Sequence, residues 1–199
     1  MKRFVWGLLA MCLLLCAFSG CGKDAKKEGD LLSGKHYAEI TVENYGVIRL
    51  ELDADVAPVT VTNFVKLVKE GFYDGVTFHR IIEGFMMQGG DPDGDGIGGA
   101  EQTIVGEFSA NGYENNLSHR RGTISMARTN DPNSASSQFF IVHEDSTFLD
   151  GNYAAFGTVV SGMDVVDAVC ENTPVEDNNG TVAAKNQPVM TAVRMTGEE

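Results

Sequence analysis

The segment FHRIIEGFMMQGGD, residues 78–91, carries the strongest pattern in the chain. Two short apolar runs, 76–82 and 85–88, are separated by a Glu-Gly pair, which is typical of two strands joined by a turn. Among these apolar side chains stand a permanent cation, Arg80, and an amide, Gln88. An isolated Arg on a strand most often forms a surface ion pair, so the question is whether this one belongs to a binding site.

Upstream of this segment the pattern predicts a hairpin and a helix. Apolar residues alternate with polar ones over 38–42 and again over 48–52, which indicates two half-buried strands. The period then changes, because apolar residues in 61–68 recur at helical spacing, with Pro58 near the start and Gly71 after the end.

Downstream, short apolar runs alternate with turns rich in Gly, Asn and Asp. The runs are 122–127, 138–142 and 154–160, followed by a second helical stretch at about 163–170 and a last strand at 189–195. Some eight short strands with two helices predict a mainly β fold, an eight-stranded antiparallel closed β-barrel capped by two α-helices. The domain is expected to cover residues 37–196, which is long enough for one substantial core.

The N-terminal end has the pattern of a processed leader. Lys2 and Arg3 precede an apolar run of about 15 residues, which is shorter than the ~20 needed to cross a bilayer. Ser19 and Gly20 then precede Cys21, an arrangement that resembles a bacterial lipobox. We expect a signal peptide at 1–20, with lipidated Cys21 as the first mature residue.

The polar segment 21–36 lacks periodicity and is expected to be a flexible tether. The protein would then be extracytoplasmic and held to a bacterial membrane through Cys21; plain secretion with a free Cys21 is the alternative.

The charge excludes one class of partner. Loss of Lys2 and Arg3 with the leader would take the formal net charge from −13 to −15. So acidic a chain is a poor match for nucleic acid. Cys170 is the one cysteine expected in the folded part, and its place at the end of an amphipathic stretch favours a buried structural role.

The central segment, SQFFIV at 137–142 and FLDGNYAAFG at 148–157 are similar, in this order and spacing, to three motifs of the cyclophilin family of peptidyl-prolyl cis/trans isomerases. The resemblance runs from about residue 37 to 196. It implies an eight-stranded antiparallel barrel with two helices, which agrees with the pattern above. It also implies isomerisation of X–Pro bonds, with no cofactor or metal. Together with the leader, this makes proteins that fold outside the cytoplasmic membrane the expected clients.

The resemblance assigns roles to individual residues. Arg80 is expected to hydrogen-bond the prolyl nitrogen or carbonyl as the bond twists, and Gln88 to hold the client backbone. Other positions match the proline pocket, the place of the preceding residue or the substrate groove: Phe85, Met86, Gly96, Ala127, Arg128, Gln138, Phe140 and Leu149.

The pocket rim departs from the best-known members. Phe148 stands where many have Trp, and Tyr153 where they have His. Cyclosporin binding in the family depends partly on that Trp, so weak cyclosporin binding is expected. Neither change removes Arg80, so we expect the pocket shape to differ and the activity to remain.

Other chemistries fit the sequence less well. His79 neighbours Arg80 on a strand and so points to the opposite face; with no proton to move, a structural hydrogen bond is expected of it. Ser125 and Ser137 lie in no GxSxG elbow. DPDGDGIGGAEQ at 91–102 imitates a calcium loop but has Gln102 where a bidentate Glu belongs. The remaining alternative is a non-catalytic module that binds Pro-containing segments or acts as a chaperone.

Overall fold

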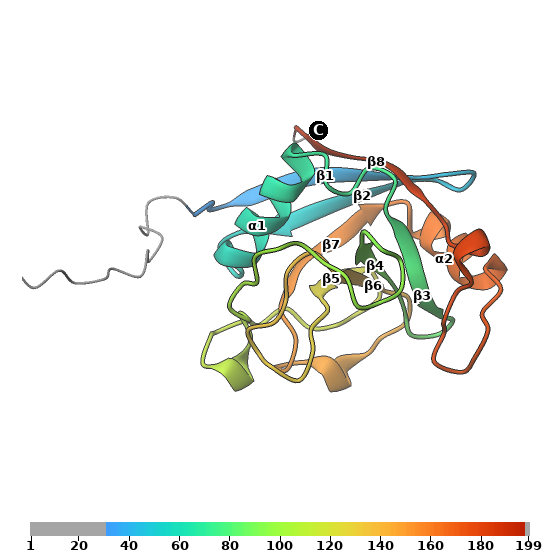
Figure 1. Cartoon of the computed structure of the whole chain (residues 1–199). Coiled ribbons are helices and arrows are strands. Elements are labelled where there is room, and N and C mark those ends of the chain that lie inside the picture. The colour runs from blue at the N-terminus through green and yellow to red at the C-terminus, as the bar shows by residue number, and fades with distance from the viewer. Residues whose placement is uncertain (1–30, 198–199) are drawn as a thin grey trace, which may run out of the picture. The chain divides into compact units, whose positions relative to one another are not determined.

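The computed structural model describes residues 31–197. The predicted leader 1–20, Cys21 and the tether as far as residue 30 lie outside the described residues. Eight strands form one antiparallel sheet in the order β3-β4-β6-β5-β7-β2-β1-β8, and the two helices lie on opposite sides of it (Figure 1). The elements are β1 Lys35–Val42, β2 Gly46–Asp53, α1 Pro58–Lys69, β3 Thr77–Ile82, β4 Met86–Asp91, β5 Thr123–Met126, β6 Phe139–Val142, β7 Ala155–Ser161, α2 Met163–Asn172 and β8 Met190–Thr196, with single 3-10 turns at Ser109–Asn111, Thr147–Leu149 and Ala184–Asn186.

The predicted first hairpin is confirmed. β1 and β2 pair in a register that sets Ala38 opposite Leu50 and Ile40 opposite Ile48, and all four side chains are fully buried. The first strand begins at Lys35, which pairs with Asp53 at the end of the ladder and also donates from its side chain to Asp53 at 2.7 Å. Part of the segment 31–36, expected to belong to the tether, also contacts the domain: the N–H of Leu32 donates to Thr62 Oγ1 at 2.9 Å and that of Gly34 to Asp55 Oδ1 at 2.7 Å.

Helix α1 is confirmed with the predicted apolar face. Val61, Phe64, Val65 and Val68 are all buried. The residue at its N-cap is an alanine, which offers no side-chain cap. Glu107, from a distant loop, supplies that cap instead. Its carboxylate accepts the N–H of Val59 at 3.0 Å and the N–H and hydroxyl of Thr60, both at 2.7 Å, where the helix dipole favours a negative charge.

Aromatic rings fill the centre of the core. Phe64 packs against Tyr73, Phe139 and Phe156 with ring centroids 5.2 to 5.7 Å apart. Phe139 also meets Phe78 edge-on at 6.1 Å. These contacts tie α1 to β3, β6 and β7, so the strand pair that carries the central segment is anchored from behind.

The barrel is less closed than predicted. The edge strands β3 and β8 meet only around a single bridge, Thr77 to Val189, with Met190 exchanging backbone hydrogen bonds with residues 75 and 76. Beyond this point a loop replaces β8 along the edge of β3: Ile81 donates to the carbonyl of Gly180 at 2.8 Å and Val182 to that of His79 at 3.0 Å. The sheet is therefore an incompletely closed barrel, because β8 stays paired with β1 and diverges from β3.

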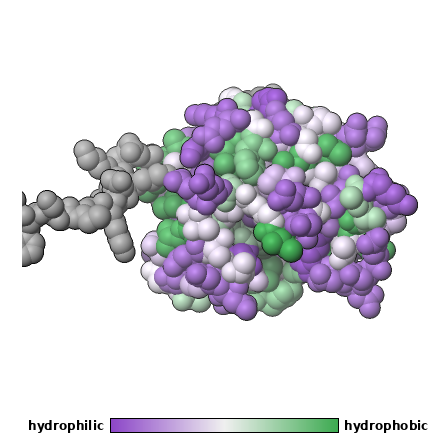
Figure 2. All heavy atoms as spheres, in the orientation of Figure 1, coloured by the Kyte–Doolittle hydropathy of each residue, from purple (hydrophilic) through white to green (hydrophobic). Residues whose placement is uncertain are grey.

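The surface carries mostly polar side chains. Figure 2 shows hydrophilic residues over most of the visible face, with apolar residues between them in small groups. Between residues 31 and 197 there is no helix with the length and apolar character needed to cross a bilayer.

Candidate functional site

The central segment forms β3, the turn and β4, and its pairing explains why a cation stands among apolar residues. Arg80 and Gln88 are direct cross-strand partners, so their side chains share one face of the sheet. The Nη1 of Arg80 donates to Oε1 of Gln88 at 3.2 Å. The register of the strand pair shifts between Phe78 and Arg80, so His79 has no cross-strand partner, and its side chain is buried.

Beside this pair lies a cavity of about 320 Å³. All of its lining residues belong to the set that the sequence predicted: Arg80, Phe85, Met86, Gln88, Ala127, Arg128, Phe140, Phe148, Leu149 and Tyr153. The remaining two predicted residues, Gly96 and Gln138, line a neighbouring cavity of about 460 Å³. The two cavities share Gln88, Ala127 and Arg128, so they form one continuous groove.

The first cavity has an apolar floor and one exposed wall. Met86, Phe140 and Leu149 are buried in a small cluster separate from the main core. At the rim, the Phe148 ring lies 5.6 Å from that of Phe85, centroid to centroid, and Phe148 is 72% exposed. Such walls suit a compact apolar ring of a ligand.

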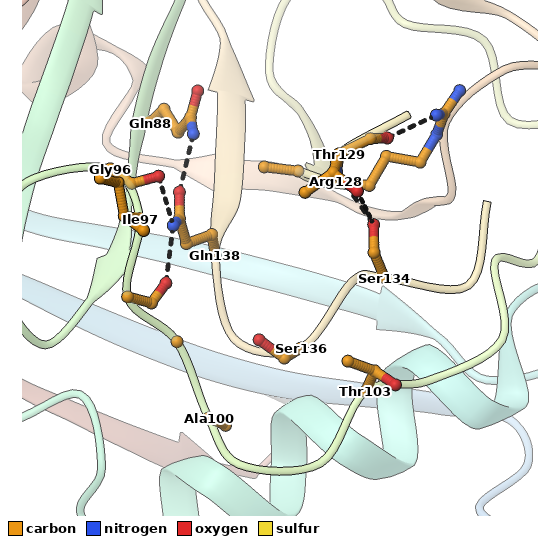
Figure 3. A pocket seen from close by; sticks show the side chains of 13 residues that line it. Gln88, Gly96, Ile97, Ala100, Thr103, Arg128, Thr129, Ser134, Ser136 and Gln138 are labelled. Carbon is orange, nitrogen blue, oxygen red and sulfur yellow. Dashed lines mark hydrogen bonds between the residues drawn. The ribbon is translucent and has the colours of Figure 1, made fainter. Parts of the chain in front are cut away.

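Side-chain amides fix the polar side of the groove. Nε2 of Gln88 donates to Oε1 of Gln138 at 2.9 Å, and Nε2 of Gln138 donates to the carbonyls of Gly96 at 3.1 Å and Gly98 at 2.8 Å. Figure 3 shows Gln138 between Gln88 and the glycine-rich loop. The Arg80 guanidinium is therefore the first member of a chain of hydrogen bonds that runs along both cavities.

Asn179, which the sequence reasoning missed, holds Arg80 from the other side. Nε of Arg80 donates to the main-chain carbonyl of Asn179 at 2.8 Å, and Nη2 donates to its Oδ1 at 3.3 Å. Asn179 lies in a turn between Asp177 and Thr181. The carboxylate of Asp177 holds this turn, because it accepts hydrogen bonds from the N–H of Asn179 and from the N–H and hydroxyl of Thr181. These hydrogen bonds lower the pKa of Asp177, so it is ionised at neutral pH.

The charge of Arg80 is secure. Burial lowers the pKa of the guanidinium, while Tyr153 and Asp177 nearby act in the opposite direction. A guanidinium stays protonated through such shifts because its pKa exceeds about 12 in proteins. The site therefore contains a permanent cation, and hydrogen bonds to Gln88 on one side and Asn179 on the other fix the orientation of its guanidinium.

Arg128 lines both cavities and stiffens the rim. Its guanidinium donates to the carbonyls of Asn152 and Thr129 at 2.8 to 3.0 Å. It also stacks over the rings of Phe108 and Tyr153, at 5.0 and 4.7 Å from their centroids. The side chain thus holds Tyr153 in place.

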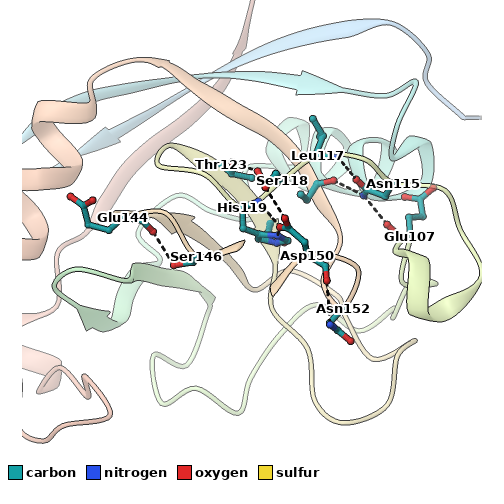
Figure 4. A network of polar contacts seen from close by, with 12 residues as sticks. Glu107, Asn115, Leu117, Ser118, His119, Thr123, Glu144, Ser146, Asp150 and Asn152 are labelled. Carbon is teal, nitrogen blue, oxygen red and sulfur yellow. Dashed lines mark hydrogen bonds and ion pairs between the residues drawn. The ribbon is translucent and has the colours of Figure 1, made fainter. Parts of the chain in front are cut away.

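A buried network supports Phe140 from behind. The His119 ring stacks on Phe140 with centroids 5.9 Å apart, and its Nδ1 and Nε2 lie 2.8 Å from Asp150 Oδ1 and 3.0 Å from Ser125 Oγ. The His119 and Asp150 side chains face each other in Figure 4. Serine, histidine and carboxylate are ordered as in a hydrolase triad, but Ser125 and His119 are fully buried, so no substrate reaches the hydroxyl. The network positions the cavity floor.

His79 does not make the predicted structural hydrogen bond. Its ring is 5% exposed, and neither nitrogen has a hydrogen-bond partner within residues 31–197. The ring packs under the glycine-rich loop near Gly96. Burial is the largest influence on its pKa and lowers it, so the ring is neutral at pH 7 and serves as packing.

The calcium-like loop uses its first carboxylate internally. Asp91 is fully buried and accepts the N–H groups of Asp93, Asp95 and Gly96 at 2.6 to 3.1 Å. Across the described part of the chain, no three His, Cys, Asp or Glu side chains are arranged to hold a metal ion. Asp91 therefore shapes the loop that borders the second cavity.

Cys170 has the predicted structural role. It is 4% exposed, and burial raises the pKa of its thiol to about 12. At neutral pH the thiol is protonated and unreactive.

Comparison with known proteins gives one consistent result. The family described as "Cyclophilin type peptidyl-prolyl cis-trans isomerase/CLD" matches residues 37–196. The chain is 47% identical over 131 residues to peptidyl-prolyl cis-trans isomerase A of Dickeya dadantii, covering 63% of this chain and 67% of that protein. It is 40% identical over 173 residues to a peptidyl-prolyl cis-trans isomerase of Acinetobacter baylyi, covering 81% and 87%.

Solved structures agree. The crystal structure of a Cryptosporidium parvum cyclophilin type peptidyl-prolyl cis-trans isomerase superposes with a TM-score of 0.73 at 29% identity, covering 83% of this chain and 100% of that one. A second crystal structure of that protein, in the presence of the dipeptide Ala-Pro, gives 0.71 at 30% identity, covering 81% and 99%.

Proposed function

This chain belongs to the cyclophilin-type peptidyl-prolyl cis-trans isomerases, and on that basis we propose how its groove turns an X–Pro bond and where the protein works. The observation that carries the mechanism is the fixed Arg80 guanidinium at the wall of a 320 Å³ apolar cavity. Proline is the one residue whose side chain is a compact apolar ring joined to the amide nitrogen.

The reaction needs no bond to be broken. Amide resonance imposes a barrier of about 18 to 20 kcal/mol, and twisting the bond moves electron density onto the prolyl nitrogen as a lone pair. A donor aimed at that lone pair stabilises the twisted state more than the planar one, which is the requirement for catalysis.

Arg80 has N–H groups available for this task. Of its five N–H donors, three have oxygen acceptors in the protein, two on Asn179 and one on Gln88, and Nη1 also makes a long contact with Met86 Sδ at 4.0 Å. One N–H on Nη2 therefore remains for the client, and the contact of Nη1 with sulfur is weak enough to be exchanged for one with the client. In this mechanism Phe85, Met86, Phe140 and Leu149 hold the proline ring, while Gln88 holds the client backbone.

The residue before proline lies at the junction of the two cavities in this proposal. Ala127 and Gln138 meet there, with Ala127 N donating to the Gln138 carbonyl at 3.0 Å. Rotation about the X–Pro bond then turns one held part of the client against the other: the proline ring in one cavity and the preceding residue at the junction. Neither acid–base nor covalent chemistry enters.

The activity and its rival can be separated in a peptide assay. The full-length protein is added to a short chromogenic peptide with an Ala-Pro bond, and protease cleavage of the trans form reports cis-to-trans conversion. The isomerase shortens the slow phase in proportion to enzyme concentration. A binding module without catalysis leaves that phase at its uncatalysed duration of about tens to hundreds of seconds.

We also propose that the protein acts outside the cytoplasmic membrane, anchored through lipidated Cys21. The support is the charged start, the short apolar run and the small pair before Cys21. In a bacterial host fed radiolabelled palmitate, the wild-type protein is expected to take up label and fractionate with membranes. Cys21→Ser should lose the label; equal labelling of both would refute the anchor.

A further inference from the structure

The two most exposed large apolar side chains in the described part of the chain both line the groove. Ile97 is 89% exposed and borders the second cavity, while Phe148, at 72%, borders the first. The other exposed large apolar residues reach only 41 to 48% and line neither cavity: Val47, Tyr113, Val160 and Val175. Single exposed apolar residues are ordinary on protein surfaces. The two most exposed ones, however, lie on the same groove, which indicates a contact surface.

Ile97 is held in a fixed direction. The Gln138 amide donates to the carbonyls of Gly96 and Gly98, on both sides of it, as Figure 3 shows for Gly96. The N–H of Ile97 donates to Asp95 Oδ1 at 2.8 Å. A loop restrained at three successive residues presents its side chain with little entropy left to lose on binding.

The course of the client leads to Ile97. If proline occupies the first cavity and the preceding residue lies at Ala127 and Gln138, the chain upstream must continue into the second cavity. Apart from Ile97, that cavity is walled by Arg128 and by hydroxyl, amide, alanine and glycine residues. Ile97 is the one large aliphatic side chain among its lining residues.

We propose that Ile97 binds an apolar side chain of the client segment upstream of the X–Pro bond, so that the enzyme selects unfolded segments with a large apolar residue there. This inference rests on the proposed function, because the direction of the client follows from the proline cavity. Segments of this kind are buried in folded proteins and exposed in unfolded ones.

Charge offers the opposing expectation. Asp93 and Asp95 are exposed on the same loop, and a surface with these two carboxylates could instead favour a cationic residue upstream. The two preferences are distinguished by testing apolar and basic side chains at the same positions of the client.

The test uses an Ala-Pro peptide extended upstream by three residues. Leu, Ser or Lys is placed in turn at each of the three positions, and kcat/KM is divided by the value for the short unextended peptide. At one of the three upstream positions, we expect Leu to give a ratio about fivefold higher than Ser. This is the scale for burying part of two aliphatic side chains. Ile97→Ser should remove the gain. Val47→Ser, a matched change at an exposed valine outside the groove, should retain it.

The outcomes are separable. Turnover of the short peptide by the wild type tests the proposed function by itself. If that turnover is normal but Leu gives no gain at any position, or Ile97→Ser and Val47→Ser retain it equally, the inference is wrong. A preference for Lys that survives Ile97→Ser would assign the selection to the carboxylates and also overturn it.

Discussion

Arg80 and Asn179 are 99 positions apart in sequence, yet Nε of Arg80 donates to the main-chain carbonyl of Asn179 at 2.8 Å. The contact exists because the loop before β8 lies along the edge of β3 where the barrel does not close. Gly180 makes this approach possible: its φ is +81°, and a Cβ there would collide with the carbonyl of Ile81. The orientation of the Arg80 guanidinium therefore depends on the loop that carries Asn179 and Gly180, which lies outside the three family motifs.

Replacing Arg80 tests the proposed donor. Arg80→Ala is expected to lower kcat/KM by about 10² to 10³, the effect of removing one preorganised donor. Arg80→Lys should recover part of the loss, because it restores charge without the fork. The control is Arg120→Ala, which removes an exposed arginine paired with Asp145 outside the groove. Near-normal turnover by Arg80→Ala, with unchanged circular dichroism, would disprove the mechanism.

The Asp177 turn offers a test of positioning. Asp177→Ala removes the acceptor of three hydrogen bonds in the turn that carries Asn179. We expect kcat to fall about fivefold to tenfold, the scale of one or two lost hydrogen bonds, with KM little changed. Glu176→Ala, at the adjacent exposed position, is the control. A loss confined to KM would show that the turn contacts the client and does not orient Arg80.

Glu107 should matter for stability and little for turnover. Glu107→Ala leaves the first N–H groups of α1 without their acceptor in a buried setting. The expected decrease in the free energy of unfolding is about 2 to 3 kcal/mol, combining a lost cap with unsatisfied donors. Urea denaturation measures it against Glu101→Ala, an exposed glutamate. An equal midpoint for the two variants would contradict the capping role.

Stability and turnover should respond differently to pH. Burial lowers the pKa of His79 and His119, so as pH falls below about 6.5 the unfolded chain takes up protons that the folded protein resists. The free energy of unfolding should therefore decrease between pH 7 and 5, by at most about 1.4 kcal/mol per pH unit for each histidine. The charges that act on the His79 pKa are Asp91, Asp95 and Arg80; for His119 the charge is Asp150.

Turnover at pH 6 to 8, in contrast, should be nearly flat, since no acid or base takes part. The slope of stability against pH, measured by urea denaturation, should be reduced in His79→Gln. A single-proton limb in kcat/KM within this window, without loss of folded protein, would return His79 to the mechanism.

The rim residue Phe148 should govern cyclosporin sensitivity more than turnover. Its ring offers an apolar wall but no N–H, so we expect weakened inhibition by cyclosporin with a working isomerase. Phe148→Trp is expected to tighten inhibition by about 1 to 2 kcal/mol, the scale of one neutral hydrogen bond plus added contact area. Inhibition titrations of both proteins in one peptide assay decide the matter; equal, tight inhibition would show that the missing indole is irrelevant.

The sequence predicted the strands, both helices and the lining of the first cavity, because these depend on local periodicity and on motifs with fixed spacing. It failed where distant segments meet. The Glu107 cap and the Asn179 contact join residues 47 or more positions apart, and neither side chain stands in a motif. The structural hydrogen bond predicted for His79 is absent because alternation along a strand reveals neither the register shift at this position nor the atoms that surround a buried ring. Closure of the barrel was overestimated because strand count does not reveal where two edges diverge.

Because β8 diverges from β3, the residues that bind the client and the loop that orients Arg80 belong to different parts of the structure. The groove residues must suit the client, whereas the loop along the β3 edge contacts Arg80 from behind and lies outside the two cavities. Protein engineers could therefore randomise this loop around a retained Gly180 to retune the rate of isomerisation while the selection of clients stays as it is.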